Sequence, residues 1–183
     1  MVVGMNVTPS PVRPPRLLIV EPSASALRVM AKRLGEAGYR VIGCPNSADA
    51  LAEMHRQKID LVVAELRMAS LSGIDLTRMI RADTVIRETP VVLVAGRSDK
   101  SGAIDGFGAG ADDVVAKPFH FEVLIARIAR RLARAAAIER LHLDRHKLDE
   151  RVTTRAIELG ELRDRLKASE AERLRLSQIA GRA

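Results

Sequence analysis

The segment IDLVVAELRMASLSGIDLTRMIR, residues 59–81, decides the fold class of this chain. It opens with an apolar run, 61–64, that has the length of a buried strand. A polar turn containing Gly73 follows, and residues 74–82 then place apolar side chains at helical spacing. A strand that is apolar throughout needs helices on both faces of its sheet, which is typical of parallel α/β sheets.

The same alternation continues along the chain in both directions. Apolar runs predict four further strands, at 17–20, 39–42, 91–94 and 114–116. Amphipathic patterns predict further helices at 24–37, 48–57 and about 101–108, and another that begins near Phe121. Strict strand–helix alternation requires right-handed crossovers and a parallel sheet. We therefore predict a doubly wound, five-stranded α/β domain over residues 16–134, with its site beyond the carboxyl ends of the strands.

The composition excludes several classes of protein. Hydrophobic residues make up 47% of the 183 residues, which is enough to form a core. The single cysteine, Cys44, excludes an internal disulfide framework and a cysteine-based zinc site. Aromatic residues make up only 2%, which disfavours a stacking platform for single-stranded nucleic acid. No apolar run is long enough to span a membrane. Residues 1–15 are proline-rich, lack the pattern of a secretory signal, and are expected to form a disordered leader.

The last third of the chain has a different pattern. Between Phe121 and Ile179 there is no proline and one glycine, so residues 135–183 are expected to form a long helical extension. Apolar residues recur at a 3-4 spacing, at Leu141, Leu148, Val152, Leu159, Leu162, Leu166 and Leu176. The same register places polar residues on this seam, at Arg145, Arg155, Ser169 and Arg173. A parallel dimeric coiled coil would bury the stripe, and the polar residues would weaken the dimer while fixing its register.

Basic residues gather in the same part of the chain. Residues 119–183 hold 15 Lys and Arg against 10 Asp and Glu, which supplies +5 of the formal net charge of +7. Four arginines of one predicted helix could bind a polyanion such as a cyclic dinucleotide: Arg127, Arg130, Arg131 and Arg134. The alternative is an ordinary helix surface whose arginine stems cover apolar neighbours. His142 and His146 have the spacing of a metal clamp but no third ligand, so we interpret them as solvated.

Four stretches in order carry a family resemblance: LLIVEPSASALRVMAKRLGEAGYRV, IDLVVAELRMASLSGIDLTRMIR, TPVVLVAGRSD and GADDVVAKPF. Together they cover about residues 16–134, and they resemble the receiver domain of two-component response regulators. The resemblance implies a flavodoxin-like fold. It also implies a site in which an acid pair holds Mg²⁺, an aspartate accepts a phosphoryl group, and a Thr or Ser and a lysine contact the phosphate. An aromatic residue on the fifth strand switches rotamer with phosphorylation in that family.

Most of those positions are occupied here by other residue types. The acid pair matches Glu21 and Pro22, and proline cannot ligate a metal through its side chain. The acceptor position holds Glu65. The hydroxyl position holds Ala95, and the aromatic position holds Val114. Within the phosphorylation site this resemblance implies, only the lysine is kept, as Lys117 before Pro118.

These replacements predict a receiver that is not phosphorylated in the usual way. Phosphoryl transfer relies on positioning and on a metal that neutralises developing charge. Glu65 reaches about 1.5 Å further than aspartate, and a displacement of about 1 Å can lower a rate about a hundredfold. The longer arm of Glu65 could instead bring its carboxylate to Lys117 and hold a phosphorylated-like conformation. The alternative is a relic site in which Glu65 points to solvent.

The sequence thus predicts a non-enzymatic signalling adaptor of the bacterial cytoplasm, with no catalytic residue, cofactor or metal site. Its expected partners are signalling proteins, either a kinase or an output module, and a second copy bound through the C-terminal helix. Membrane association is not expected, and neither is binding to nucleic acid. Two alternatives stay open. One is an effector that binds a second messenger or polyanion through the arginine-rich helix. The other is the regulatory fragment of a larger signalling enzyme, because the tail is similar to linkers that precede output domains.

Overall fold

A computed structural model describes residues 13–97 and 99–180. The predicted leader therefore lies outside the described residues up to position 12. The chain divides after Ala136 into two compact units, which are treated separately below. The first contains an α/β domain, and the second is helical.

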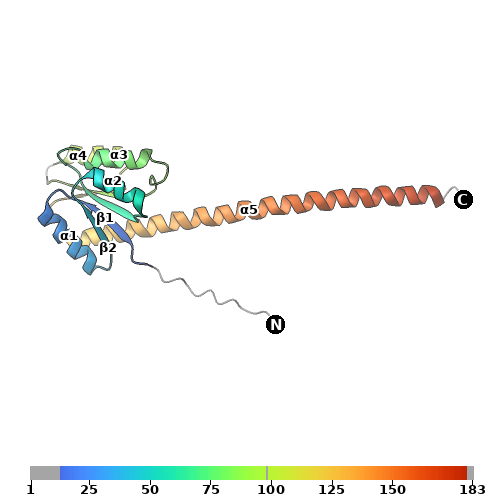
Figure 1. The fold of residues 1–183 in the computed structure, drawn as a ribbon, viewed down its shortest axis with the longest axis horizontal. Coiled ribbons are helices and arrows are strands. Elements are labelled where there is room, and N and C mark those ends of the chain that lie inside the picture. The colour runs from blue at the N-terminus through green and yellow to red at the C-terminus, as the bar shows by residue number, and fades with distance from the viewer. Residues whose placement is uncertain (1–12, 98, 181–183) are drawn as a thin grey trace, which may run out of the picture. The chain divides into compact units, whose positions relative to one another are not determined.

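Strands and helices alternate through the first unit, as predicted (Figure 1). The elements are β1 (Arg16–Val20), α1 (Ala24–Glu36), β2 (Arg40–Cys44), α2 (Ser47–Arg56), β3 (Leu61–Glu65), α3 (Gly73–Ala82), β4 (Val91–Ala95), α4 (Lys100–Gly108), β5 (Asp113–Ala116) and α5 (Phe121–Ala180). The strands form one parallel sheet in the order β2-β1-β3-β4-β5. This order is that of the doubly wound flavodoxin-like sheet, which confirms the predicted fold class.

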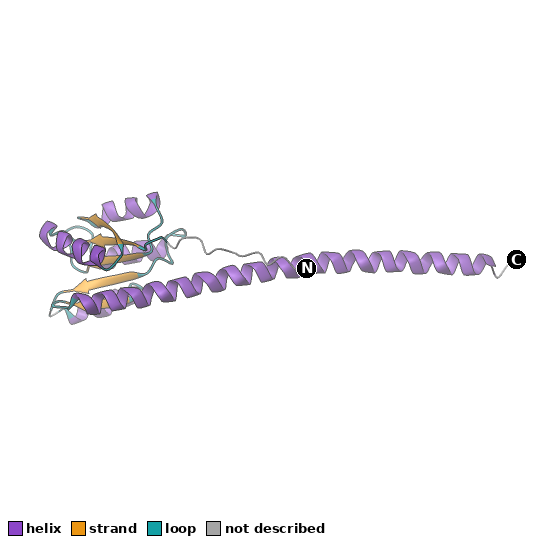
Figure 2. Ribbon diagram, turned by 90° about the horizontal axis from the view of Figure 1, so that it is seen from below, coloured by secondary structure: helices purple, strands orange, loops and turns teal. Residues whose placement is uncertain are grey.

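The sheet separates two hydrophobic cores, because successive side chains of a strand point to opposite faces. On β1, Leu18 and Val20 belong to a core completed by α2 and α3. Leu17 and Ile19 belong to the other core, completed by α1 and the first turns of α5. All four side chains are fully buried. Figure 2 shows the strands between these helical layers, so the sheet edges at which strands end are the places left for a site.

Side chains cap the helices that start beside those strand ends. Ser72 accepts a hydrogen bond from the backbone N–H of Asp75, and the Asp75 carboxylate accepts one from the N–H of Ser72. This reciprocal pair satisfies N–H groups that have no partner within α3. Ser23 and Asn46 cap α1 and α2 in the simpler way. Capping fixes where each helix begins, and with it the short loops that carry the site.

The second unit consists of the continuation of α5, which the structure describes to Ala180. Its apolar side chains are exposed: Leu141 is 67% accessible to solvent and Leu162 is 60% accessible. Within the described residues no helix is long and apolar enough to cross a membrane. Hydrophobic packing inside this unit therefore does not account for the leucine spacing.

Candidate functional site

The parallel sheet brings the predicted site residues to one edge. Glu65 is the last residue of β3 and lies opposite Val94 of β4. Ala95 ends β4 and lies opposite Ala116, the residue before Lys117. Glu21 directly follows β1. Residues separated by up to 96 positions in the sequence thus meet at the carboxyl ends of four strands.

The Lys117 ammonium lies between the two acidic side chains. Its Nζ donates to Oε2 of Glu65 at 2.5 Å and to Oε2 of Glu21 at 3.4 Å. The other carboxylate oxygen of Glu21 accepts a hydrogen bond from the N–H of Ser23 at 2.9 Å. The Glu65 side chain is only 14% accessible, so it does not point to solvent. The contact between Glu65 and Lys117 that the sequence allowed is present.

Burial and charge act against each other within this cluster. Burial raises the pKa of Glu65, the hydrogen bond and charge of Lys117 lower it, and Glu21 raises it again, with a net upward direction. Burial alone would lower the pKa of Lys117, but the two carboxylates outweigh it and the net shift is upward. We take the Glu65–Lys117 pair as charged at neutral pH, because a donor and acceptor this close stabilise the ionised forms of both groups.

The arrangement does not fit the magnesium site that the fold family implies. Mg²⁺ requires near-octahedral oxygen ligands. Pro22 supplies no side-chain oxygen, and the facing oxygens of Glu21 and Glu65 are already engaged by an ammonium group. In residues 13–97 and 99–180 no group of three or more His, Cys, Asp or Glu side chains is placed to hold a metal ion. The positive charge of this site is therefore supplied by Lys117.

The two remaining family positions are apolar in character. Ala95 is 2% accessible and belongs to the core beneath the site, where its methyl group can make no hydrogen bond. Val114 is partly buried and packs against the same core. Gly106 of α4 leaves room beside Val114, because a Cβ at that position would meet both Leu93 and Val114. The side chain at this position is thus a small aliphatic one that packs between the core and α4.

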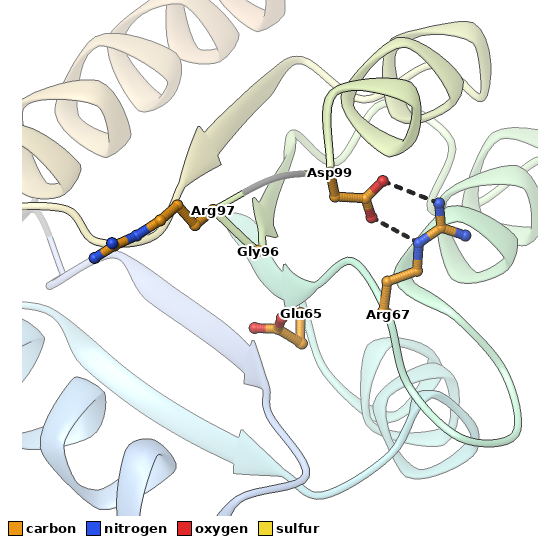
Figure 3. Close-up of a pocket in the computed structure, with 5 residues that line it drawn as sticks. All are labelled: Glu65, Arg67, Gly96, Arg97 and Asp99. Atoms are coloured by element: carbon orange, nitrogen blue, oxygen red, sulfur yellow. Dashed lines mark hydrogen bonds and ion pairs between the residues drawn. The ribbon is translucent and has the colours of Figure 1, made fainter.

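An open depression of about 490 Å³ lies beside Glu65 (Figure 3). It is lined by Glu65, Arg67, Gly96, Arg97 and Asp99. Arg67 binds Asp99 with two hydrogen bonds, at 2.7 and 3.2 Å. Figure 3 shows Arg97 extending away from this pair. The Arg67–Asp99 pair therefore links the loop after β3 to the loop after β4 across the depression.

Asp99 also caps α4 by accepting the N–H of Gly102 at 2.8 Å. The Arg67 side chain and this backbone N–H lower the pKa of Asp99 from 3.8 to about 2. The sequence pattern alone indicates no role for Arg67 or Asp99. Their separation of 32 residues gives no periodic signal, although an aspartate just before a predicted helix is a capping signal.

Gly73 is a third residue whose role the sequence did not reveal. A Cβ at this position would clash with the carbonyl oxygen of Glu65 and press on Leu93. The N–H of Gly73 donates to the carbonyl of Leu66 at 3.1 Å, which closes the loop against β3. Glycine is needed here because another part of the backbone approaches closely. The start of α3 can therefore pack directly against the backbone of Glu65.

The four candidate anion-binding arginines do not act as one free cluster. Arg127 Nη1 contacts the two carboxylate oxygens of Asp113 at 2.9 and 3.1 Å, and Arg131 approaches the same carboxylate at 3.5 Å. Asp113 is 7% accessible, so these arginines neutralise a buried acid and fasten α5 to β5. Arg130 and Arg134 are exposed. Two of the four candidate arginines, Arg127 and Arg131, are therefore already paired with an acidic side chain of the same domain.

Asp112 and His146 each contact a neighbouring residue of the chain. Asp112 pairs with Arg81 at 2.8 Å and accepts the N–H of Val91 at 2.9 Å. On the C-terminal helix, His146 lies 3.7 Å from Glu150, one turn further along. Asp112 thus has a structural role, and the surface contact of His146 agrees with its interpretation as a solvated residue.

Comparisons with known proteins agree with this geometry. The model of the response regulator receiver domain family matches residues 17–129. The two-component response regulator PhoP of Pseudomonas aeruginosa is 36% identical over 121 residues, which are 66% of this chain and 53% of PhoP. The DNA-binding response regulator MtrA of Mycolicibacterium paratuberculosis is 31% identical over 119 residues, 65% of this chain and 52% of MtrA.

Solved structures show the same likeness. A response regulator receiver protein from Pseudomonas putida has a TM-score of 0.60 and 29% identity, covering 64% of this chain and 97% of that one. The chain spans about half the length of the curated relatives it matches. The family model covers more than half of the chain, and it matches the part that carries the strands and the Glu65–Lys117 pair. The chain therefore belongs to the response regulator receiver domain family.

Proposed function

We propose that this receiver works in two-component signalling without accepting a phosphoryl group. The observation that carries the proposal is the ion pair between Glu65 and Lys117, with 2.5 Å between Nζ and Oε2. In the family, the lysine at this position contacts the phosphate. Here the Glu65 carboxylate already binds Lys117. We therefore propose that this domain signals through contacts with other proteins.

The chemistry of the remaining positions supports the same proposal. Phosphoryl transfer to a carboxylate needs a metal and hydrogen-bond donors placed around the reacting group. Pro22 and Ala95 offer neither a metal ligand nor a hydroxyl, and the longer Glu65 side chain shifts the acceptor oxygen. We assign no catalytic residue and no cofactor to the domain.

The partners we propose are a kinase or an output module of a signalling system in the cytoplasm, and a second copy of the chain. The second copy is proposed from the helix after Ala136, whose leucines recur at heptad spacing and are exposed. Dimerisation would bury a stripe that the chain leaves accessible.

A second candidate is that these residues are the regulatory part of a longer signalling protein. The specific observation in its favour is that the curated relatives are about twice as long as the matched region. In that case the helix after Ala136 would connect the receiver to the further domain. The receiver chemistry proposed above is the same in both cases.

The test is incubation with acetyl phosphate and Mg²⁺, followed by intact mass spectrometry at neutral pH. We expect the natural chain to gain no phosphoryl group. The triple variant Pro22→Asp, Glu65→Asp, Ala95→Thr restores the family residues and is expected to gain one. Glu65→Asp alone is the matched control, and it should react much less than the triple variant because the metal ligand and the hydroxyl are still missing.

Phosphorylation of the natural chain at Glu65 would overturn the proposal. Failure of the triple variant, with its fold verified by circular dichroism, would show that features other than these three positions prevent the reaction. The dimer is tested separately by light scattering of the full chain. A monomer at high protein concentration would remove that part of the proposal.

A further inference from the structure

The residue pattern of the C-terminal helix indicates the direction in which two copies pair. We propose that the helices of two copies run antiparallel, with Leu148 of one copy facing Leu159 of the other. This inference rests on the dimer proposed above and goes beyond it by naming the orientation and the register. It concerns residues 138–169, whose side chains are exposed throughout.

The seam of this helix is defined by its heptad positions. The first core position, a, is occupied by Ile138, Arg145, Val152, Leu159 and Leu166, and the second, d, by Leu141, Leu148, Arg155, Leu162 and Ser169. The apolar members are between 41% and 67% accessible. Between Ile138 and Leu166 the seam is interrupted twice, and arginine is the interrupting residue both times.

A parallel, in-register pair places identical residues opposite each other. Two layers of such a dimer would then consist of like charges: Arg145 on Arg145 and Arg155 on Arg155. Arg145 would have Asp144 of the other copy beside it, but the residue flanking Arg155 from the other copy would be Ala156. Like charges held at a seam without an acid nearby oppose association. The parallel pairing expected from the leucine spacing alone therefore carries a charge penalty.

Reversing one helix pairs a positions with d positions and separates the arginines. With Leu148 opposite Leu159, the next layers are Leu141 opposite Leu166, Arg145 opposite Leu162, and Val152 opposite Arg155. Each of the two seam arginines, Arg145 and Arg155, then packs its aliphatic stem against an apolar residue, while its guanidinium can extend to the rim. No layer in residues 138–169 contains two charges.

The flanking residues select this register among the antiparallel ones. The positions one residue before each a position alternate in sign along the helix: Asp144, Arg151, Glu158 and Arg165. In an antiparallel pair these positions face one another. The proposed register sets Asp144 against Arg165 and Arg151 against Glu158, and each pair occurs twice by symmetry. Moving one helix by one heptad in either direction sets acid against acid and Arg against Arg.

Flanking charges alone would not decide the direction. A parallel pair would also gain two complementary contacts, Glu158 with Arg163 and Arg165 with Glu170, but it would place Asp144 against Asp149. In the antiparallel register one flanking contact joins two basic residues, His142 and Arg163. The difference comes from the core layers, where the parallel pair opposes two arginines and the antiparallel pair opposes none.

The first experiment is disulfide trapping in the full chain, with Cys44→Ala as the background so that one thiol remains. Leu148→Cys and Leu159→Cys variants are oxidised separately and as a mixture. We expect cross-linked dimer only in the mixture. In the antiparallel pair the two copies of position 148 are about 16 Å apart along the axis. A disulfide spans at most about 7 Å between Cα atoms.

The second experiment leaves the core untouched and uses charge reversal. Arg151→Glu should raise the dimer dissociation constant about tenfold, because two complementary contacts become repulsive. The double variant Arg151→Glu, Glu158→Arg restores both contacts and should return the constant to within about twofold of the natural chain. In a parallel pair the double variant would instead be weaker than the single one, because residue 158 would then oppose Arg163.

The outcomes separate this inference from the proposed dimer. A dimer by light scattering that forms the mixed disulfide, with rescue by the double variant, supports the antiparallel register. A dimer that cross-links through Leu148→Cys alone overturns the orientation and leaves the dimer standing. A monomeric natural chain overturns the dimer, and the orientation with it.

Discussion

Leucine has opposite surroundings in the two units of this molecule. Leu18 of β1 is fully buried between the sheet and α2 and α3. Leu162 of the C-terminal helix is 60% accessible, and so is Leu166 one turn further on. Burying such a side chain contributes about 2 kcal/mol. The α/β unit obtains this contribution within one chain, whereas in the helical unit the proposed dimer would supply it.

The difference shows where each unit obtains its stability. A single helix gains little from its own hydrogen bonds once nucleation is counted, and most helical stability in proteins comes from packing of an apolar face. The α/β unit packs two cores against one sheet. The helix after Ala136 presents its apolar face to solvent, and the proposed dimer would supply the packing that this face lacks.

The same substitution should have very different effects in the two units. Leu18→Ala should destabilise the α/β unit by about 3 kcal/mol, because it removes buried methyl groups and leaves a cavity. Leu162→Ala should leave that unfolding transition within about 0.5 kcal/mol and should instead raise the dimer dissociation constant. Urea denaturation and light scattering measure the two effects. Equal loss of α/β stability in both variants would contradict the separation.

The fold could be predicted because its signal is local. Five apolar runs alternate with helical patterns, and each predicted strand overlaps the observed one. β2 is the least accurate: it was expected at 39–42 and extends over Arg40–Cys44, because Gly43 and Cys44 pair with Ile19 and Val20. Gly43 has no side chain to give a strand pattern, and a Cβ there would crowd Leu27 at 3.1 Å.

The site could be predicted only in part. The Glu65–Lys117 contact was anticipated because the family resemblance already placed both residues at one edge of the sheet. The binding of Asp113 by Arg127 and Arg131 was not, since an arginine-rich helix surface has the same sequence pattern whether its partner is solvent, a ligand or a buried acid. Which partner an arginine takes depends on the packing of α5 against β5.

Lys117→Met tests the same difference between the two units for a charged residue. The variant leaves Glu21 and Glu65 buried without their cation, and we expect a loss of about 2 kcal/mol at pH 7, allowing for the 39% accessibility of the lysine. Lys147→Met, on the exposed helix, is the matched control and should change α/β stability by less than about 0.5 kcal/mol.

The pH dependence of this loss has a definite sign. Folding raises the pKa of Glu65, so the folded state binds this proton more tightly than the unfolded state does, and stability falls as the pH rises through the folded pKa. Without Lys117 that pKa rises further. The deficit of Lys117→Met should therefore be largest at neutral pH and shrink as the pH falls through the raised pKa of Glu65, in urea titrations at several pH values. A deficit that is constant with pH would show that Lys117 acts through packing alone.

The smallest expected effect concerns exposed ion pairs, which both units contain. Arg67 holds Asp99 beside the depression, and Arg145 lies 3.9 Å from Asp149 on the helix. Because the pKa of Asp99 is lowered to about 2, its contribution to stability is complete above its ordinary pKa of 3.8 and is lost as the pH falls through about 2. Arg67→Gln should move the Asp99 titration upward toward 3.8, as followed by the NMR shift of its carboxyl carbon. Arg145→Gln should leave that titration where it is, and an unmoved Asp99 in Arg67→Gln would mean that the cap on Gly102 alone holds the carboxylate.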